Sequence, residues 1–309
     1  MTFERVDSYT LIDTLQHNGK SLADSAHVVG TTAAHGAEKF EFTHLFDHIK
    51  DSHELETPFG HIALPQFEPF TVGGLTIDLS ITKHVFFLWL AAIILLIAAI
   101  WSARNYKKSL VPRGFTNAFE TIIVFLRDEV VIANMGREGL KYLPYLLTTF
   151  FFILLMNLMG LIPYGSTSTG NVAVTAGLAF IAFIMIQVAA IRAQGFGHYL
   201  AHLTGGVPWF LWPIMVPIEI IGLFTKPFAL CIRLFANMTG GHLVILSLIG
   251  LIFIFQSYVV SPIPILFVVA IDMLELFVAF LQAYIFTMLT SLFMGMGIQA
   301  AEHQEELAH

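Results

Sequence analysis

From position 217 to position 242 the sequence reads Pro217-Ile-Glu-Ile-Ile-Gly-Leu-Phe-Thr-Lys-Pro-Phe-Ala-Leu-Cys-Ile-Arg-Leu-Phe-Ala-Asn-Met-Thr-Gly-Gly-His242. It is an apolar stretch with one arginine, Arg233, inside it. Between positions 220 and 301 the only formally charged side chains are Lys226, Arg233, Asp272 and Glu275. A guanidinium at bilayer depth costs about 3 kcal/mol on insertion scales, and it stays charged at any working pH. A cation kept at this cost indicates that Arg233 has a function.

The composition of the whole chain predicts an all-α polytopic membrane protein. Of the 309 residues, 56% are hydrophobic and only 12% are charged, and the mean hydropathy is +0.76. A soluble chain of this length needs charge distributed over its surface, yet 12 of the 22 acidic residues lie within positions 1 to 80. The net charge of -7 argues against nucleic acid as a partner. The single cysteine, Cys231, cannot form an internal disulfide, and we interpret it as a small packing residue.

Uncharged runs locate the first three membrane crossings. Residues 85 to 103 suffice to cross about 30 Å of hydrocarbon. The following segment, 104 to 113, holds four basic residues and no acid, which places it on the cytoplasmic side and the N-terminus outside. Residues 115 to 134 alternate apolar and charged side chains and predict a helix along the membrane surface. The runs 142 to 162 and 172 to 191 form the second and third crossings.

The last two apolar runs are too long to stand upright in a bilayer. The run from Pro213 to about Gln256 would be about 66 Å long as a helix, and the run from Pro264 to Ala301 is similarly long. We expect two long, steeply tilted helices that turn near Ser261 to Pro264, with a local kink at Pro227. The predicted fold has five membrane-crossing helices and one interfacial helix. It divides into an outer region (1–80), a membrane domain (81–301) and a cytoplasmic tail (302–309).

The N-terminal region gives weaker signals. Residues 40 to 56 place apolar side chains at helical spacing and predict one amphipathic helix. The cluster His44, Asp47, His48, Asp51 and His53 has metal-ligand types, but a solvated helix face is the simpler interpretation, and we expect no metal and no cofactor. Gly19-Lys20-Ser21 lacks the upstream glycine of a phosphate loop, which excludes that type of nucleotide site.

Two polar stripes run along the last two predicted helices. Glu219, Lys226 and Arg233 recur every seven residues and so share one stripe, with Asn237 one turn further. His242 follows about 13 Å beyond Arg233 along the helix axis, whereas Glu219 lies about 21 Å in the other direction. On the last helix Asp272, Glu275 and Gln282 form the second stripe. His242 and Glu275 should reach similar depth, where an imidazole and a carboxylate could relay protons.

These motifs together resemble subunit a of F-type ATP synthase. The resemblance rests on Pro227 to His242 and on Leu281-Gln-Ala-Tyr-Ile-Phe-Thr-Met-Leu289, with support from Asn157-Leu-Met-Gly-Leu-Ile-Pro163 and Asn171-Val-Ala-Val-Thr175. It covers about residues 85 to 300. It implies a stator beside a ring of c subunits, peripheral-stalk b subunits as further partners, and two aqueous half-channels that meet the ring at different depths.

The resemblance also implies roles for individual residues. Arg233 matches the family's essential arginine, which keeps the passing ring carboxylate deprotonated and blocks a direct leak. Asn237, His242, Glu275 and Gln282 match positions of the outer half-channel, and Glu219 matches a position of the inner one. Asp272 lies in the same stripe of the last helix as Glu275 and Gln282. It could act as a proton relay or serve as a structural residue.

We therefore expect a proton-translocating subunit that does no covalent chemistry and binds no nucleotide, in a bacterial inner membrane with its C-terminus in the cytoplasm. The alternative from another class is a secondary transporter with a midplane binding site, although no repeat of matching halves is evident. A third possibility is a structural assembly subunit in which Arg233 pairs with Asp272 or Glu275 to lock two helices together. Lys226 on its own is typical of a cation that extends toward the membrane surface.

Overall fold

The computed structural model describes residues 54–57, 60–66, 70–72, 75–77, 80–108, 114–162, 168–203, 209–255 and 262–308. Two short antiparallel hairpins come first. Strand β1 (Glu54–Thr57) pairs with β2 (Gly60–Ala63), and β3 (Phe70–Val72) pairs with β4 (Leu75–Ile77). The regular elements that follow in the described part are helical.

The hairpins correct one expectation. Most of the amphipathic helix predicted for residues 40 to 56, together with the histidine cluster, lies outside the described residues. Where the structure does describe that segment, at Glu54 to Glu56, the chain is a strand, so the prediction is wrong there. A physical reason is that Thr57 precedes a proline, which disfavours the helical region for that residue.

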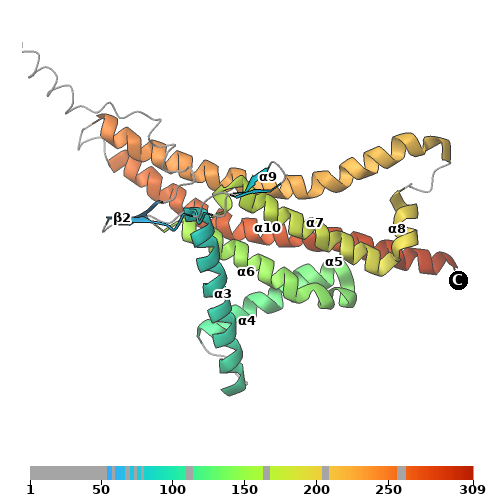
Figure 1. The fold of residues 1–309 in the computed structure, drawn as a ribbon. Coiled ribbons are helices and arrows are strands. Elements are labelled where there is room, and N and C mark those ends of the chain that lie inside the picture. Colours follow the sequence, from blue (N-terminus) through green and yellow to red (C-terminus); the bar gives the residue numbers. More distant parts are fainter. Residues whose placement is uncertain are drawn as a thin grey trace, which may run out of the picture. The chain divides into compact units, whose positions relative to one another are not determined.

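Helix α3 (Lys83–Lys108) contains the first predicted crossing. It packs against α6 (Leu143–Gly160), while large side chains such as Trp89, Leu96 and Ile97 remain exposed around it. Exposed apolar side chains on the uncharged run 85–103 of this helix are those expected of a surface in contact with lipid. Figure 1 shows that α3 crosses the direction of α9 and α10 at a large angle. If α3 is upright in a bilayer, the last two helices are therefore strongly tilted.

The segment before α6 is an unbroken run of helical types. It comprises α4 (Phe115–Phe125), the π-helix η1 (Leu126–Ile132), the short α5 (Ala133–Met135) and the 3₁₀-helix η2 (Gly136–Tyr142). Gly136 has a φ of 61°, which L side chains rarely adopt. The chain reverses between α5 and α6 (Figure 1). The helical structure predicted for 115 to 134 is confirmed, with a π-helical turn in it, and its position along the membrane surface stays a prediction.

Helices α7 and α8 follow the short 3₁₀-helix η3 (Ser168–Gly170). The side chain of Asn171 caps α7 (Val172–Gln194), because its Oδ1 accepts the Ala173 N–H at 2.8 Å. Gly195, with a φ of 78°, ends α7 and lets α8 (Phe196–Leu203) begin in a new direction. The 3₁₀-helix η4 (Trp209–Leu211) then leads into α9.

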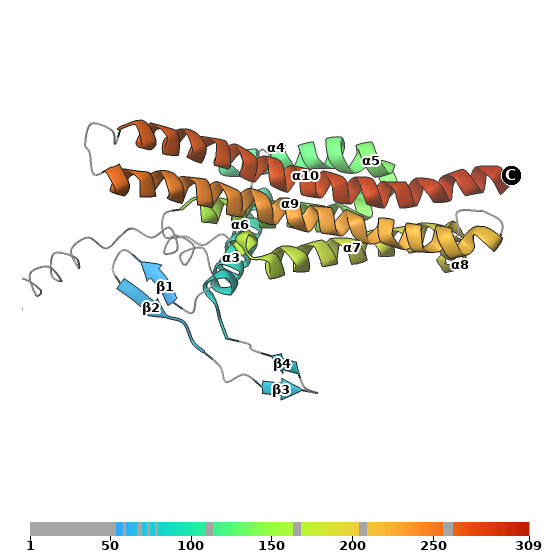
Figure 2. The same cartoon turned by 90° about the horizontal axis from the view of Figure 1, so that it is seen from above.

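Helix α9 has the length that the sequence predicts, and α10 is longer than predicted. Helix α9 (Trp212–Phe255) has 44 residues and continues through Pro217, Pro227 and the Gly240-Gly241 pair, and α10 (Pro262–Ala308) has 47 residues. Each is about twice as long as the hydrocarbon layer is thick. The segment predicted as a tail from residue 302 continues α10 as far as Ala308. Figure 2 shows the two helices side by side, and Figure 1 shows them diverging toward α8.

Helices α6, α7, α9 and α10 share one core. Phe150 of α6, Leu230 and Leu234 of α9, and Phe286 of α10 are all at most 2% exposed. Within the described residues, five helical stretches are long and apolar enough to cross a membrane: Lys83–Asn105, Thr116–Gly160, Val172–Gln194, Trp212–Leu251 and Pro262–Ala301. The predicted fold class, an α-helical polytopic membrane domain with two long final helices, is confirmed.

Candidate functional site

The buried face of α9 determines where its polar residues lie. Leu230, Leu234 and Met238 repeat every four residues and are at most 2% exposed, so they form the ridge that packs into the molecule. Arg233 and Asn237 each precede a member of this ridge by one residue, about 100° around the helix. Both are exposed, at the edge of the packed face. Packing of α9 therefore presents Arg233 outward.

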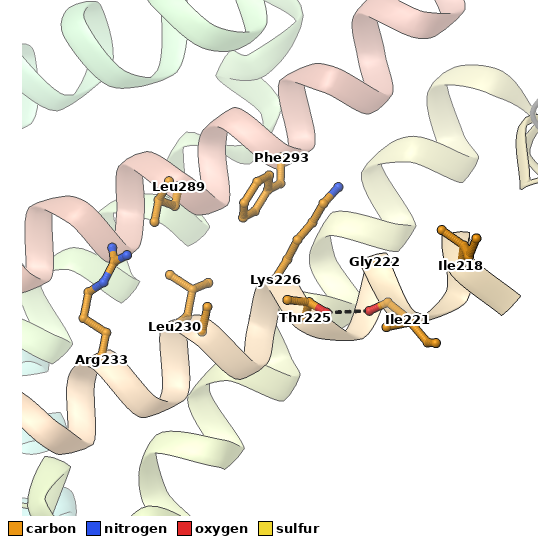
Figure 3. Close-up of a pocket in the computed structure, with 10 residues that line it drawn as sticks. Ile218, Ile221, Gly222, Thr225, Lys226, Leu230, Arg233, Leu289 and Phe293 are labelled. Carbon is orange, nitrogen blue, oxygen red and sulfur yellow. Dashed lines mark hydrogen bonds between the residues drawn. The ribbon is translucent and has the colours of Figure 1, made fainter. Parts of the chain in front are cut away.

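A groove of about 540 Å³ runs along α9 beside α10 and ends at Arg233 (Figure 3). It is lined by Ile218, Ile221, Gly222, Thr225, Lys226, Ala229, Leu230 and Arg233 of α9 and by Leu289 and Phe293 of α10. In Figure 3 the guanidinium of Arg233 points toward Leu289. The ammonium of Lys226 lies 4.9 Å from the centre of the Phe293 ring, a cation–π contact. The groove thus carries two cations in otherwise apolar walls.

Arg233 has no ion pair with any residue in the described part of the chain. Ion pairs between described residues include Arg127 with Asp128 and Lys141 with Glu138, both far from α9 in the sequence. The helix-locking pair between Arg233 and Asp272 or Glu275, considered from the sequence, is absent among the described residues. Among the described residues the guanidinium therefore has no carboxylate partner, and its charge is available for a group outside them.

Asn237 and Gln282 join the two polar stripes. The amide Nδ2 of Asn237 donates to Oε1 of Gln282 at 2.8 Å, and Gln282 is only 1% exposed. This bond connects α9 to α10 one turn beyond Arg233. It satisfies the buried Gln282 oxygen, which would otherwise cost about 1–3 kcal/mol.

Glu275 lies against the backbone of Gly241. The side chain is 3% exposed, and neither carboxyl oxygen has a hydrogen-bond partner among the described residues. A Cβ placed on Gly241 would stand 2.7 Å from Oε1 of Glu275, so a larger residue there would displace the carboxyl group from its observed position. Asp272, which is exposed, lies near enough for its charge to act on both His242 and Glu275. The structure thus brings His242, Asp272 and Glu275 together beyond Arg233.

Glu219 lies apart from this group, toward α8. It is not among the residues that line the groove, although its neighbour Ile218 is. Its charge acts on the phenol of Tyr199 in α8, whose hydroxyl donates to Oε1 of Gln187 in α7 at 2.5 Å. Sequence reasoning missed Tyr199 and Gln187, because only the fold brings α7, α8 and α9 together at this point.

A buried polar contact also connects α6 to its neighbours. Asn157, fully buried, donates to the Ala279 carbonyl at 3.3 Å and accepts from the Thr169 hydroxyl at 2.8 Å. Ser168, also fully buried, donates to the His84 carbonyl at 2.8 Å. Asn157 stood out in the sequence, but its partner Thr169 did not. These bonds hold η3 and α6 against α3 and α10, and Ala279 lies one helical turn after Glu275 in α10.

The sequence profile of the ATP synthase A chain family matches residues 85–295 of this chain. Among curated relatives, an ATP synthase subunit a from Chloroherpeton thalassium is 49% identical over 88% of this chain and 80% of its own length. One from Chlorobium phaeobacteroides is 48% identical over 94% of this chain and 89% of its own. A third, from Myxococcus xanthus, is 53% identical over 75% and 78%.

Proposed function

This chain belongs to the ATP synthase subunit a family and is a membrane subunit of F-type ATP synthase, and from this premise we propose that it is the proton-translocating stator. In this proposal Arg233 faces a ring of c subunits, and two aqueous half-channels reach the ring on either side of it. The chain performs no covalent chemistry. Proton flow through it turns the ring, and the rotation drives ATP synthesis elsewhere in the complex.

The observation that carries this proposal is the exposed guanidinium of Arg233, which has no ion pair in the described part of the chain. An unpaired cation facing lipid costs about 3 kcal/mol or more. A carboxylate on a neighbouring ring would remove that cost, because opposite charges attract strongly at low dielectric. The same attraction favours the ionised form of the carboxylate. Each ring acid would therefore release its proton as it comes near Arg233.

The polar groups on either side of Arg233 support two separate routes. His242, Asp272 and Glu275 lie together beyond Arg233, and we assign them to the outer route. On the other side the groove extends from Arg233 to Ile218, beside Glu219, and we assign it to the inner route. Leu230 and Leu234 are at most 2% exposed. In this proposal their packing separates the outer route from the inner route. A proton would then have to travel on the ring to pass from one route to the other.

The proposal includes a place in the cell. We assign the chain to a bacterial inner membrane, with the N-terminal region outside and the C-terminal end of α10 in the cytoplasm. The four basic residues between 104 and 113 support this orientation. The peripheral-stalk b subunits are the further partners that it implies.

The test is ATP-driven proton pumping in inverted membrane vesicles that carry the assembled enzyme. Arg233→Ala should abolish pumping, while the ring and the peripheral stalk still co-purify with the chain. Arg137→Ala, which removes an exposed arginine in η2, is the matched control and should pump normally. Normal pumping by Arg233→Ala would contradict the stator role, and loss of co-purification alone would favour a purely structural subunit. Solute uptake by this chain alone in liposomes would favour the transporter.

A further inference from the structure

The groove beside α10 contains a second cation, Lys226, to which the two routes described so far give no role. Its ammonium lies 4.9 Å from the centre of the Phe293 ring, and the side chain reaches across the groove toward α10 (Figure 3). Lys226 is partly buried and makes no ion pair with any residue in the described part of the chain. The groove therefore holds a positive charge that has no carboxylate partner among the described residues.

The Phe293 ring gives this ammonium a defined position. The ring packs against a buried cluster of side chains from η1, α6, α7 and α10, so it is a fixed surface. A cation over an aromatic face is attracted by the ring, and the attraction is stronger where water is excluded. Apart from Thr225 and Arg233, the groove around Lys226 is lined by apolar residues. The contact with Phe293 thus keeps the charge of Lys226 inside the groove.

Few charged groups can act on Lys226. On α9, Glu219 and Arg233 are each seven residues away, which is about 10 Å along the helix axis. Of the other elements packed against α9, η3 and η4 have no titratable side chain. The remaining titratable groups are Arg192 on α7, His198, Tyr199 and His202 on α8, and on α10 Tyr284 and those before residue 276 and after residue 301. Those among them that the structure describes do not line the groove, where Arg233 is the other charged side chain.

We propose that Lys226 is a second electrostatic residue of the translocation site: held over the Phe293 ring, it extends the region in which a ring carboxylate stays ionised from Arg233 into the inner route. This inference rests on the proposed function. Because opposite charges favour the ionised form of an acid, Lys226 promotes release of the proton into the inner route and opposes its uptake from there. Phe293 is a positioning residue, since it acts on the carboxylate only through the ammonium.

The size of the effect follows from the distance along α9. A carboxylate paired with Arg233 would lie about 10 Å from Lys226. Two unit charges about 10 Å apart, at an effective dielectric of about 20, move a titration midpoint by about one pH unit. A carboxylate that leaves Arg233 toward the inner route would come closer to Lys226 and respond more strongly. Without the charge of Lys226, ring acids at the inner route should therefore stay protonated up to a higher pH.

The test measures ATP-driven pumping by the assembled enzyme in inverted vesicles as a function of the external pH, to which the inner route opens. Pumping takes up protons from that side, so its rate falls as the external pH rises. Lys226→Met removes the charge and keeps an unbranched side chain, and it should move the midpoint of that fall up by about one pH unit. ATP synthesis by the same vesicles releases protons there, so its fall at low external pH should also begin about one unit higher. Lys226→Arg keeps the charge and should keep both midpoints.

Two further variants separate the position of the charge from its presence. Phe293→Leu leaves the ammonium without its ring and should move the midpoints in the same direction by less than Lys226→Met. The double variant should match Lys226→Met alone, because both changes act through one charge. Lys141→Met is the control and should leave the midpoints unchanged. The Lys141 ammonium also lies over an aromatic ring, 5.6 Å from the centre of Tyr142, but in η2 and outside the groove.

Unchanged midpoints in Lys226→Met would overturn the inference and leave a cation that extends toward the membrane surface. So would an equal fractional loss of rate at all pH values, which indicates a structural contact, or the same shift in Lys226→Arg as in Lys226→Met. If Lys226→Met does not assemble, unchanged midpoints in Phe293→Leu would overturn it instead. Arg233→Ala in the same vesicles separates the two proposals: if it abolishes pumping while Lys226→Met shifts nothing, only this inference fails, and if it pumps normally, the stator role fails first.

Discussion

Gly241→Ala should disable the outer route without unfolding the protein. A methyl group at position 241 would stand 2.7 Å from Oε1, 2.8 Å from Cδ and 3.2 Å from Oε2 of Glu275. Ordinary van der Waals contact begins at 3.4 Å, so the carboxyl group must move by about 0.7 Å, the difference between 3.4 and 2.7 Å. The obstructing atoms belong to the end of a flexible side chain, so the backbone of α9 can stay in place. An alanine also stabilises a helix interior by about 1 kcal/mol relative to glycine.

The substitution should slow proton transfer, because Glu275 is 3% exposed and its carboxyl group has little room to rearrange. A misplacement of about 1 Å in a reacting group can lower a rate about 100-fold. We expect Gly241→Ala to lower ATP-driven pumping at least tenfold, with normal co-purification of the complex. Gly240→Ala is the matched control, since a Cβ there meets nothing within 4 Å. Equal pumping by the two alanine variants would show that the position of Glu275 is unimportant and would refute this reasoning.

Three further changes test the contacts around the site. Asn237→Ala should leave the Gln282 oxygen buried and unpaired, at a cost of about 1–3 kcal/mol. Thermal inactivation of the complex should then have a lower midpoint temperature, and an unchanged midpoint counts against that contact. Asn157→Ala should lower the same midpoint by removing two buried hydrogen bonds and leaving a cavity, and the prediction fails if the variant is as stable as the parent. Gly295→Ala would force a methyl group against the backbone carbonyl of α5, so the yield of assembled complex should fall; a normal yield would be evidence against the close packing of α10 there.

The membrane helices could be predicted from the sequence, because their signal is local. The predicted runs 85–103 and 172–191 fall inside α3 and α7 as observed. The length of the last two apolar runs was enough to predict long helices, since about 66 Å of helix cannot stand upright in about 30 Å of hydrocarbon. The two β-hairpins were not predicted. Strands of three or four residues have too little periodicity to detect, and their pairing depends on the partner strand.

The candidate site could be predicted in part. The spacing of Lys226 and Arg233 is a property of one helix, and both line one groove. The contact of Asn237 with Gln282 depends on how two helices are placed along each other, which one sequence does not specify. The same holds for Glu275 beside Gly241. Glu219 was expected in the stripe of Arg233, but the effect of its charge on Tyr199 depends on the path of α8.

The central claim is that Arg233 faces the acids of a neighbouring ring rather than acids of its own chain. An experimental density map of the assembled membrane sector measures this directly, as the distance from the guanidinium to the nearest carboxylate. We predict a ring carboxylate within about 4 Å, the range of an ion pair, in at least one rotary position. A guanidinium that is remote from the ring and bonded to Asp272 or Glu275 would contradict the account.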